Sequence, residues 1–288
     1  MSIDLPRAAL AGLERSCNDG ESRRDWVRLA TGSRGIERAE AHFGGQAFAP
    51  HRHDTYVVGL TTRGVQCFDY RGSLRRSLPG QFVVLHPDEQ HDGRPGTETG
   101  FGFKVIYLDP SLVHASAPGR PLPFAADPVV RDERISAMLR PAFDEFDEDL
   151  DELAAVDLVA GLTAALRTLC GTRSRRCGSV DAPALVRARE FLLAAPYCSR
   201  LRVEALEAEA GLDRWRLSRQ FRRAFGTSPY RFFQLRRVKR ARALIEQGVG
   251  IAAAAVETGF ADQSHLTRQF KRTYGLSPGR WAAITGGR

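Results

Sequence analysis

Short runs of alternating hydrophobic and polar residues dominate the chain between residues 36 and 108. They are separated by turn sequences such as GG, RGS and PG, and they cover residues 36–43, 56–62, 65–70, 74–78, 81–86 and 102–108. A period of two places every second side chain on one face, as in strands with one buried face. Six such strands at close spacing predict a small antiparallel barrel or sandwich.

The pattern becomes helical between residues 129 and 170. Leu158, Leu162, Leu166 and Leu169 recur at steps of four and three, so they form one apolar stripe. The acidic run DEFDEDLDE before it suits a helix N-terminus, where negative charge meets the positive end of the helix dipole. The stripe covers either the core of the chain itself or a dimer seam, and the sequence leaves both open.

The expected fold class is α+β with two domains. Residues 1–35 show little periodicity and predict an N-terminal arm, whereas 36–170 form an antiparallel β-barrel with its following helices. GTRSRRCGSVDAP, at 171–183, predicts a linker. Residues 184–288 read as all helical and form the second domain.

One sixteen-residue sequence occurs twice in the helical region. LSRQFRRAFGTSPYRF begins at Leu217 and returns 49 residues later as LTRQFKRTYGLSPGRW at Leu266, with nine identical positions. Each copy carries cations on one helix face and Leu or Phe on the other, and then ends at Gly and Ser-Pro. Such a helix suits a nucleic-acid groove.

The outward faces of the two copies follow from helical spacing. In the first copy, Asp213 predicts an N-cap, and Trp215, Ser218, Arg219 and Arg222 share a face opposite the apolar residues. In the second, Asp262 predicts the cap. The outward positions there are Ser264, Thr267, Arg268 and Lys271, and Gln263 and His265 add polar groups near the start.

Arginine can bond guanine with two parallel donors, so Arg219 and Arg268 are the best candidates for base readout. Cations further along the helices predict phosphate contacts. A helix at 229–247 joins the two copies and spans roughly 28 Å, which suits adjacent major grooves about 34 Å apart. The expected phosphate contacts on the copies and the joining helix are Arg222, Arg223, Arg236, Lys239, Arg240, Lys271 and Arg272.

The charge of the chain is concentrated in the same region. From Asp181 onward there are 20 Arg and Lys against 9 Asp and Glu, a net of +11; the preceding residues hold 22 against 25, a net of −3. This asymmetry indicates a polyanionic partner for the second domain. Five cysteines without CxxC spacing predict reduced thiols, and the lack of an 18-residue apolar run predicts a cytoplasmic protein without a membrane partner.

The helical region resembles the AraC/XylS family of bacterial transcription regulators, whose DNA-binding domain has two helix-turn-helix units joined by one helix. The motifs are GLDRWRLSRQFRRAFGTSPYRFFQLRRVKRARALI and GFADQSHLTRQFKRTYGLSPGRW. The resemblance implies base contacts that coincide with the derived faces and favours an activator. The implied base-contacting residues are Trp215, Ser218, Arg219, Gln263, Ser264, His265, Thr267 and Arg268.

The N-terminal region resembles the cupin-like effector domain of the same family. GQAFAPHRHDTY and LPGQFVVLHPDEQH carry this looser match, which implies a barrel that senses a small molecule. Aromatic residues on the strands either line a pocket or pack in the core. The expected effector-binding residues are His51, His53, Tyr56, Phe68, Tyr70, His86 and His91.

The same histidines suggest a metal, since cupin enzymes hold a divalent ion with His-x-His, a Glu and a later His. Val57 and Val58 stand where the Glu belongs, and Val83 stands where the later His belongs. The sequence therefore favours polar anchors for an organic effector, or structural hydrogen bonds, over a metal site. A site of three or four histidines stays open if His86 or His91 turns inward, but no metal and no cofactor are expected.

Three functions of different classes compete. The favoured one is a ligand-responsive regulator without catalytic activity, whose partners are promoter DNA, a small organic effector, a second copy of the chain and, as a candidate, RNA polymerase. The alternatives are a metal-dependent cupin enzyme fused to a DNA-binding domain, and an architectural or repair protein. The missing Glu argues against the enzyme, and the lack of a reactive Cys cluster argues against repair.

Overall fold

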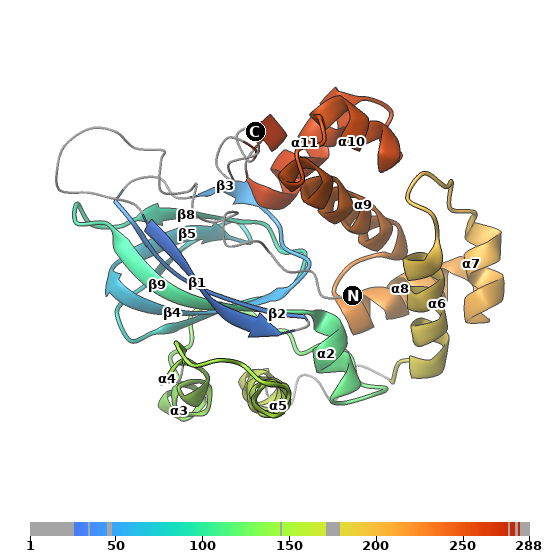
Figure 1. The fold of residues 1–288 in the computed structure, drawn as a ribbon. Coiled ribbons are helices and arrows are strands. Elements are labelled where there is room, and N and C mark those ends of the chain that lie inside the picture. Colours follow the sequence, from blue (N-terminus) through green and yellow to red (C-terminus); the bar gives the residue numbers. More distant parts are fainter. Residues whose placement is uncertain are drawn as a thin grey trace.

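The computed structural model describes residues 26–33, 35–44, 48–144, 146–170, 179–275, 277–279 and 282. Within them, strands form two antiparallel sheets that face each other (Figure 1). The larger sheet has the order β1-β2-β9-β4-β7 and the smaller one β3-β8-β5-β6. The strands are β1 (Trp26–Ser33), β2 (Ile36–Phe43), β3 (Phe48–His51), β4 (Tyr56–Gly64), β5 (Gln66–Tyr70), β6 (Ser73–Ser77), β7 (Phe82–Leu85), β8 (His91–Pro95) and β9 (Phe101–Leu108).

The six strand predictions are confirmed, within one or two residues at most ends. β1 differs from the expectation because it lies inside the segment predicted as an arm. Its sequence, WVRLATGS, contains Arg28 and ends in small residues, and it pairs only with β2 at the edge of the sheet. An edge strand of this composition shows too little alternation to be recognised.

Alternation along the larger sheet separates two cores. Val57 and Val83 belong to the core between the two sheets, together with Phe68, Tyr70 and Phe103. The alternate positions face the opposite way and pack against helices. They include Tyr56, Val58, Phe82, Val84, Ile106 and Leu108.

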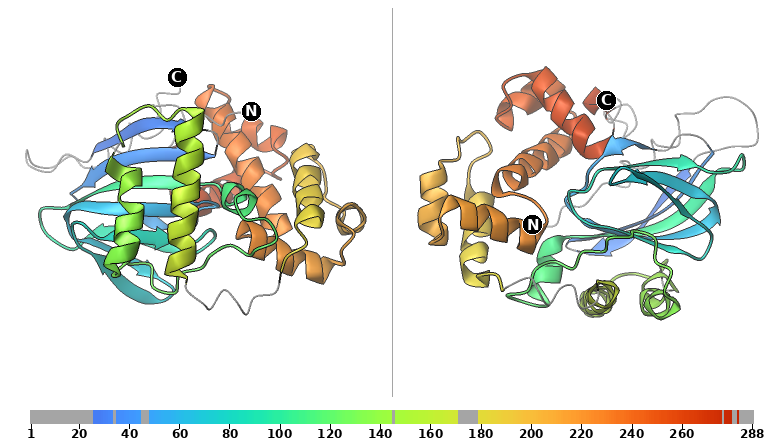
Figure 2. Two further views of the ribbon diagram at one scale, coloured as in Figure 1. Left: turned by 90° about the horizontal axis from the view of Figure 1, so that it is seen from below. Right: turned by 180° about the vertical axis from the view of Figure 1, so that it is seen from behind.

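Helices that follow the strands cover this outer face of the larger sheet (Figure 2). Leu162 and Leu166 of the longest one are buried there, and Leu158 and Leu169 pack against the same cluster. The leucine stripe is therefore part of the intramolecular core. The helices of this domain are α2 (Pro110–Ala115), α3 (Glu133–Leu139), α4 (Pro141–Asp144) and α5 (Glu152–Leu169).

The C-terminal domain is helical, as predicted, and contains two small cores. One core contains Leu217, Phe221 and Phe233, and the other contains Val238, Leu266 and Phe270. The long helix α9 contributes to both. The helices are α6 (Ala182–Ala194), α7 (Val203–Ala210), α8 (Arg214–Phe225), α9 (Pro229–Glu246), α10 (Ile251–Glu257) and α11 (Gln263–Tyr274). Across the described part of the chain, no helix combines the length and apolarity that crossing a membrane requires.

Candidate functional site

The two repeated segments form equivalent helices, α8 and α11, with the same start and stop signals. The Asp213 carboxylate accepts from the backbone N–H groups of Trp215 and Arg216 at 3.0 Å, and the Asp262 carboxylate accepts from that of His265 at 2.6 Å. Each cap satisfies N–H groups that have no partner within the helix. Both helices end at a glycine with positive φ, 75° at Gly226 and 70° at Gly275.

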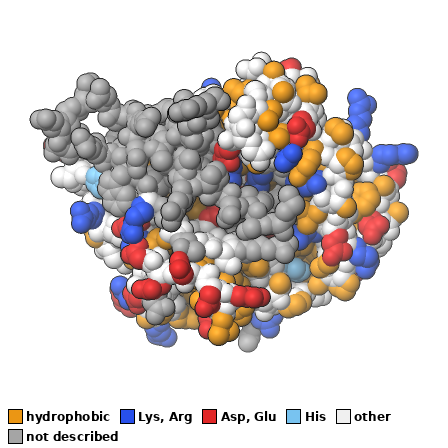
Figure 3. Space-filling model, in the orientation of Figure 1, with side chains coloured by type: hydrophobic (Ala, Val, Ile, Leu, Met, Phe, Trp, Pro, Cys, Tyr) orange, Lys and Arg blue, Asp and Glu red, His pale blue; other side chains and the backbone are white. Residues whose placement is uncertain are grey.

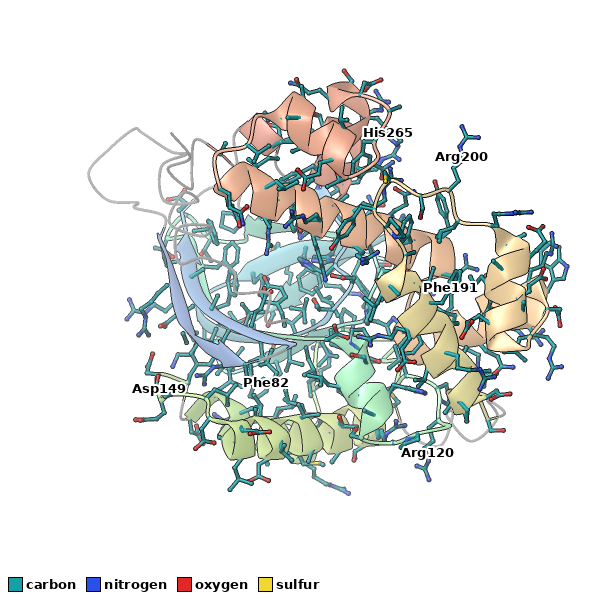
Figure 4. All side chains as sticks on the ribbon, turned by 45° about the vertical axis from the view of Figure 1, so that its right-hand side comes forward. Phe82, Arg120, Asp149, Phe191, Arg200 and His265 are labelled. Atoms are coloured by element: carbon teal, nitrogen blue, oxygen red, sulfur yellow. The ribbon has the colours of Figure 1, made fainter. Side chains whose placement is uncertain are left out.

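The outward faces of both helices are exposed as predicted. Trp215 is 78% exposed, and Arg219 and Arg268 are also exposed, whereas Leu217 and Leu266 are buried. Ser218 and Thr267 lie half-buried beside the exposed arginines. Gln263 and Ser264 are exposed at the start of α11, and the His265 ring packs edge-on against Phe260 with centroids 5.3 Å apart (Figure 4).

Most of the expected phosphate-contacting residues on α8 and α11 are also accessible. Arg222, Lys271 and Arg272 are exposed, whereas Arg223 is half-buried and its carbonyl accepts from the Leu122 N–H of the N-terminal domain. In Figure 3, basic side chains project at the right-hand edge, where the helical domain lies, and acidic ones gather over the lower part of the N-terminal domain. Acidic side chains also lie among the basic ones on the right-hand side, so this face shows the charge asymmetry of the sequence only in part.

The cations of α9 differ from the prediction. Arg236 donates to the carbonyl oxygens of Leu192 and Ala195 at 3.1 and 2.5 Å, and its guanidinium lies 4.2 Å from the Tyr197 ring centroid. It ties α9 to the end of α6, so it does not face outward as expected. Arg240 is half-buried, with 33% of its side chain exposed, and pairs with Glu257 at 2.9 Å within the helical domain.

Lys239 is the clearest correction. It forms an ion pair with Asp54 of the N-terminal domain, and only 27% of its side chain is exposed. Burial alone would lower the pKa of Lys239, but the carboxylates of Asp54 and Asp109 outweigh it and raise the pKa. A charge committed to another domain in this way is not available to phosphate in this arrangement. The sequence could not reveal the pair, because its two residues lie 185 positions apart.

Further contacts hold the two domains together. Asp88 forms an ion pair with Arg231 and accepts from the Thr227 hydroxyl at 3.3 Å, while His114 packs against Phe225. α11 packs against β3, so α9 and α11 lie over the end of the sandwich that β3 forms (Figure 1). This end, with the residues that face α9, is called the barrel mouth below.

Three of the four histidines singled out in the sequence meet at the barrel mouth. His51 on β3 is the register partner of His91 on β8, and His53 follows β3. Ring nitrogens from the three residues all lie within 4.8 Å of one another, and the two Nε2 atoms of His51 and His53 are 3.1 Å apart. Burial lowers the pKa of each imidazole, to about 3 for His91, so all three are neutral at pH 7.

Residues outside the predicted set complete the mouth. The Tyr107 ring lies 5.3 Å from that of His53, and Tyr107 is the register partner of Glu37. Burial, and then the Glu37 charge, raise the pKa of Tyr107. Burial also raises the pKa of Glu37, although Arg242 and Lys239 oppose this shift. Tyr107 lies four positions after Phe103 on the same strand, so alternation puts both on one face, but nothing local marks Glu37 or Asp54.

The other predicted effector residues separate into two groups. Phe68 and Tyr70 lie in the core between the sheets, and their contact with an effector stays a prediction. Tyr56 and His86 do not, because the neighbouring positions Val57 and Leu85 take the inward face. The Tyr56 hydroxyl donates to the carbonyl oxygen of Pro123 at 2.6 Å, and its ring lies against His86 on the helix-covered side.

Both halves of the chain match known families. Residues 34–162 match the model of an AraC-like ligand binding domain, and residues 206–283 match the model of a helix-turn-helix domain. The chain is 25% identical over 224 residues to the HTH-type transcriptional regulator YbfI of Bacillus subtilis strain 168. The matched region covers 76% of this chain and 82% of that protein.

Solved structures of ToxT from Vibrio cholerae share the fold of nearly the whole chain. One has a TM-score of 0.55 at 12% identity and covers 92% of this chain and 99% of that one. Another, of wild-type ToxT from strain SCE256 with a bound unsaturated fatty acid, has a TM-score of 0.57 at 12% identity and covers 94% and 99%. At this level of identity the likeness establishes the fold alone.

Proposed function

The chain belongs to the AraC/XylS family of transcription regulators, and from this premise we propose that it is a sequence-specific activator controlled by a small organic effector. In this proposal α8 and α11 read bases in two successive major grooves, and the N-terminal domain binds the effector. The effector changes how the two helices engage DNA, with RNA polymerase as the downstream partner. No catalytic step is part of the proposal.

The observation that carries the proposal is the matched exposure of Arg219 and Arg268. Each lies on the outward face of a helix that has an Asp N-cap and a Gly C-cap, so two structurally equivalent helices offer one guanidinium each. Trp215, Ser218 and Thr267 border these arginines. A bidentate arginine is the commonest specific contact to guanine in the major groove.

The joining helix sets the spacing of the two readers. α9 has 18 residues, which corresponds to about 27 Å at 1.5 Å per residue. Its own side chains pack into the cores behind both readers, so it acts as a rigid spacer between them. Adjacent major grooves on one face of the duplex are about 34 Å apart, which two helices held on such a spacer can match.

The effector is proposed to bind at the barrel mouth. His51, His53, His91 and Tyr107 offer polar groups there, and α9 lies across the same end through Lys239. A ligand at this position changes the domain contact directly, which supplies the differential interaction that an effector needs. Because ToxT has been solved with an unsaturated fatty acid, long-chain carboxylic acids are the first class to screen by thermal shift.

A homodimer is also part of the proposal. Leu153 and Val156 are 72% and 60% exposed on the outer face of α5, the side that the intramolecular core leaves open. A second copy would double the number of DNA contacts. Sedimentation of the full chain, with and without the selected DNA, measures the oligomeric state.

Selection of binding sites from a random DNA pool tests the regulator function. We expect one enriched site with two motifs about one helical turn apart. Arg219→Ala and Arg268→Ala should each cost about 1–3 kcal/mol at that site and relax the preference at one base pair. Arg200→Ala is the matched control, because Arg200 is exposed, lies between α6 and α7 and not on either reader, and points into solvent (Figure 4). If neither reader variant changed the enriched sequence, the proposed readout would be wrong.

A further inference from the structure

Three imidazoles converge at the barrel mouth with more lone pairs than they can satisfy among themselves. The Nδ1 atoms of His51 and His91 lie 2.8 and 3.1 Å from the carbonyl oxygens of Ala49 and Glu89. A carbonyl accepts, so each Nδ1 carries the proton and donates. The remaining ring nitrogen of both residues, Nε2, therefore carries a lone pair.

A neutral His53 can satisfy only one of these two lone pairs. Its Nε2 lies 3.1 Å from Nε2 of His51, so a hydrogen bond between those two atoms accounts for one. A neutral imidazole has a single N–H, which cannot serve the Nε2 of His91 as well. A divalent cation would accept all three lone pairs at once.

We infer that His51, His53 and His91 form a binding site for a divalent metal ion of the zinc class. Ligand nitrogens in a tetrahedral zinc site lie about 3.3 Å apart, given Zn–N distances of about 2.0–2.1 Å. The His51–His53 separation of 3.1 Å is already close to this value, and the 4.8 Å limit for the set leaves only small ring rotations to be made. This inference goes beyond the proposed function and does not depend on DNA recognition.

The surroundings of the three residues have the features of a supported metal site. Backbone carbonyls that hold the distal nitrogens of ligating histidines fix the tautomer and the ring orientation, and Ala49 and Glu89 supply them here. His51 and His91 are buried and paired across two strands, which holds both rings on a rigid frame. Burial keeps the imidazoles in the neutral form that binds metals.

The composition of the set indicates the class of metal. Three neutral imidazoles suit Zn²⁺, and also Co²⁺ and Ni²⁺, better than Mg²⁺ or Ca²⁺, which prefer oxygen. Three protein ligands leave a fourth position for water or for an exogenous ligand, as in open zinc sites. The Glu of cupin enzymes, replaced here by valine, is not needed for such a set.

The test uses the full-length chain without an affinity tag, stripped with a chelator and titrated with Zn²⁺ against a metal-binding dye. We expect one ion per chain, and Co²⁺ should give the intense visible bands of a tetrahedral nitrogen site. His53→Gln is the primary variant, since His53 is half-buried and its loss leaves the His51–His91 strand pair intact. It should weaken binding by at least about 100-fold, beyond the loss typical of an outer-shell partner.

His42→Gln provides the matched control. His42 lies on β2 of the same domain, half-buried and outside the cluster, so its loss should leave the affinity for Zn²⁺ within about twofold. Circular dichroism of each metal-free variant checks the fold. Absence of saturable binding at one ion per chain would overturn the inference, and so would equal Zn²⁺ affinities of the wild type and a folded His53→Gln variant.

Discussion

The ion pair between Lys239 and Asp54 gives the sharpest test of how the two domains are held together. Lys239 lies on the helix that spaces the readers, and Asp54 directly follows His53 at the barrel mouth. Asp54→Asn removes the negative charge but keeps the size of the side chain. It leaves the Lys239 ammonium largely buried, with its direct partner gone and only more distant charges such as Asp109 in support.

The magnitude follows from the exposure of the pair. Breaking a fully buried pair costs about 3–5 kcal/mol, and an exposed pair is worth about 0–1 kcal/mol. The two side chains are 27% and 21% exposed, so we expect Asp54→Asn to cost about 2 kcal/mol. The next residue of α9 offers the control. Arg240 pairs with Glu257 inside the helical domain, and Glu257 is 49% exposed, so Glu257→Gln should cost less than about 0.5 kcal/mol.

Two double-mutant cycles isolate the interaction energy of each ion pair from the other effects of the substitutions. The first combines Asp54→Asn with Lys239→Met, and the second combines Glu257→Gln with Arg240→Gln. Urea unfolding followed by circular dichroism gives the coupling energy of each pair, provided that the transition of each domain is fitted separately. We expect at least about 1 kcal/mol for the first cycle and near zero for the second. If the first coupling did not exceed the second, the domains would not be held by this pair.

Two further predictions concern stability. Burial lowers the pKa of His86 from 6.5 to about 4, so the folded protein loses stability relative to the unfolded chain as the pH falls from 6.5 toward 4. The loss amounts to about 3 kcal/mol. In His86→Gln the melting temperature should therefore fall less steeply with decreasing pH over this range. Gly226→Ala places a Cβ 2.5 Å from Pro87 in addition to the strain of φ 75°, whereas Gly211→Ala at φ 67° meets nothing closer than 3.7 Å. The first should therefore destabilise by about 2–3 kcal/mol and the second by about 1 kcal/mol, and similar melting temperatures for the two variants would refute the predicted contact.

Local sequence patterns were sufficient to predict the helices and strands whose two faces lie in different environments. Strands β4, β7 and β9 direct alternate residues to two different cores, β5 buries one face, and α8 and α11 carry caps that a sequence shows directly. Which of two cores a given strand face packs into could not be predicted from the same patterns. Tyr56 and Val57 are both apolar enough for either core, so the choice between the helix side and the interior depends on the register of β4 with β7 and β9.

The candidate site was predictable only in part, for the same reason. HRHDTY marks two of the three clustered histidines, because the His-x-His spacing puts both near the end of one strand. His91 rather than His86 joins them, since β8 pairs with β3 while β7 belongs to the other sheet. The pairing of strands that are distant in the sequence determines which histidine joins the cluster. The residues next to His86 and His91 in the sequence do not distinguish the two.

The cations of α9 show why net charge is a weak guide to DNA contacts. Arg236 and Arg237 donate to backbone carbonyls of α6 and of the segment before α11, and Lys239 is paired with Asp54 of the other domain. These structural contacts require long cationic side chains, just as phosphate binding does. Each of the three side chains fills a space between two elements and donates to carbonyl or carboxylate oxygens there. A helix that must space two readers and also dock onto a second domain therefore carries charge for structural reasons. The salt dependence of DNA binding should accordingly reflect the exposed cations of α8 and α11 more than the +11 of the whole helical region.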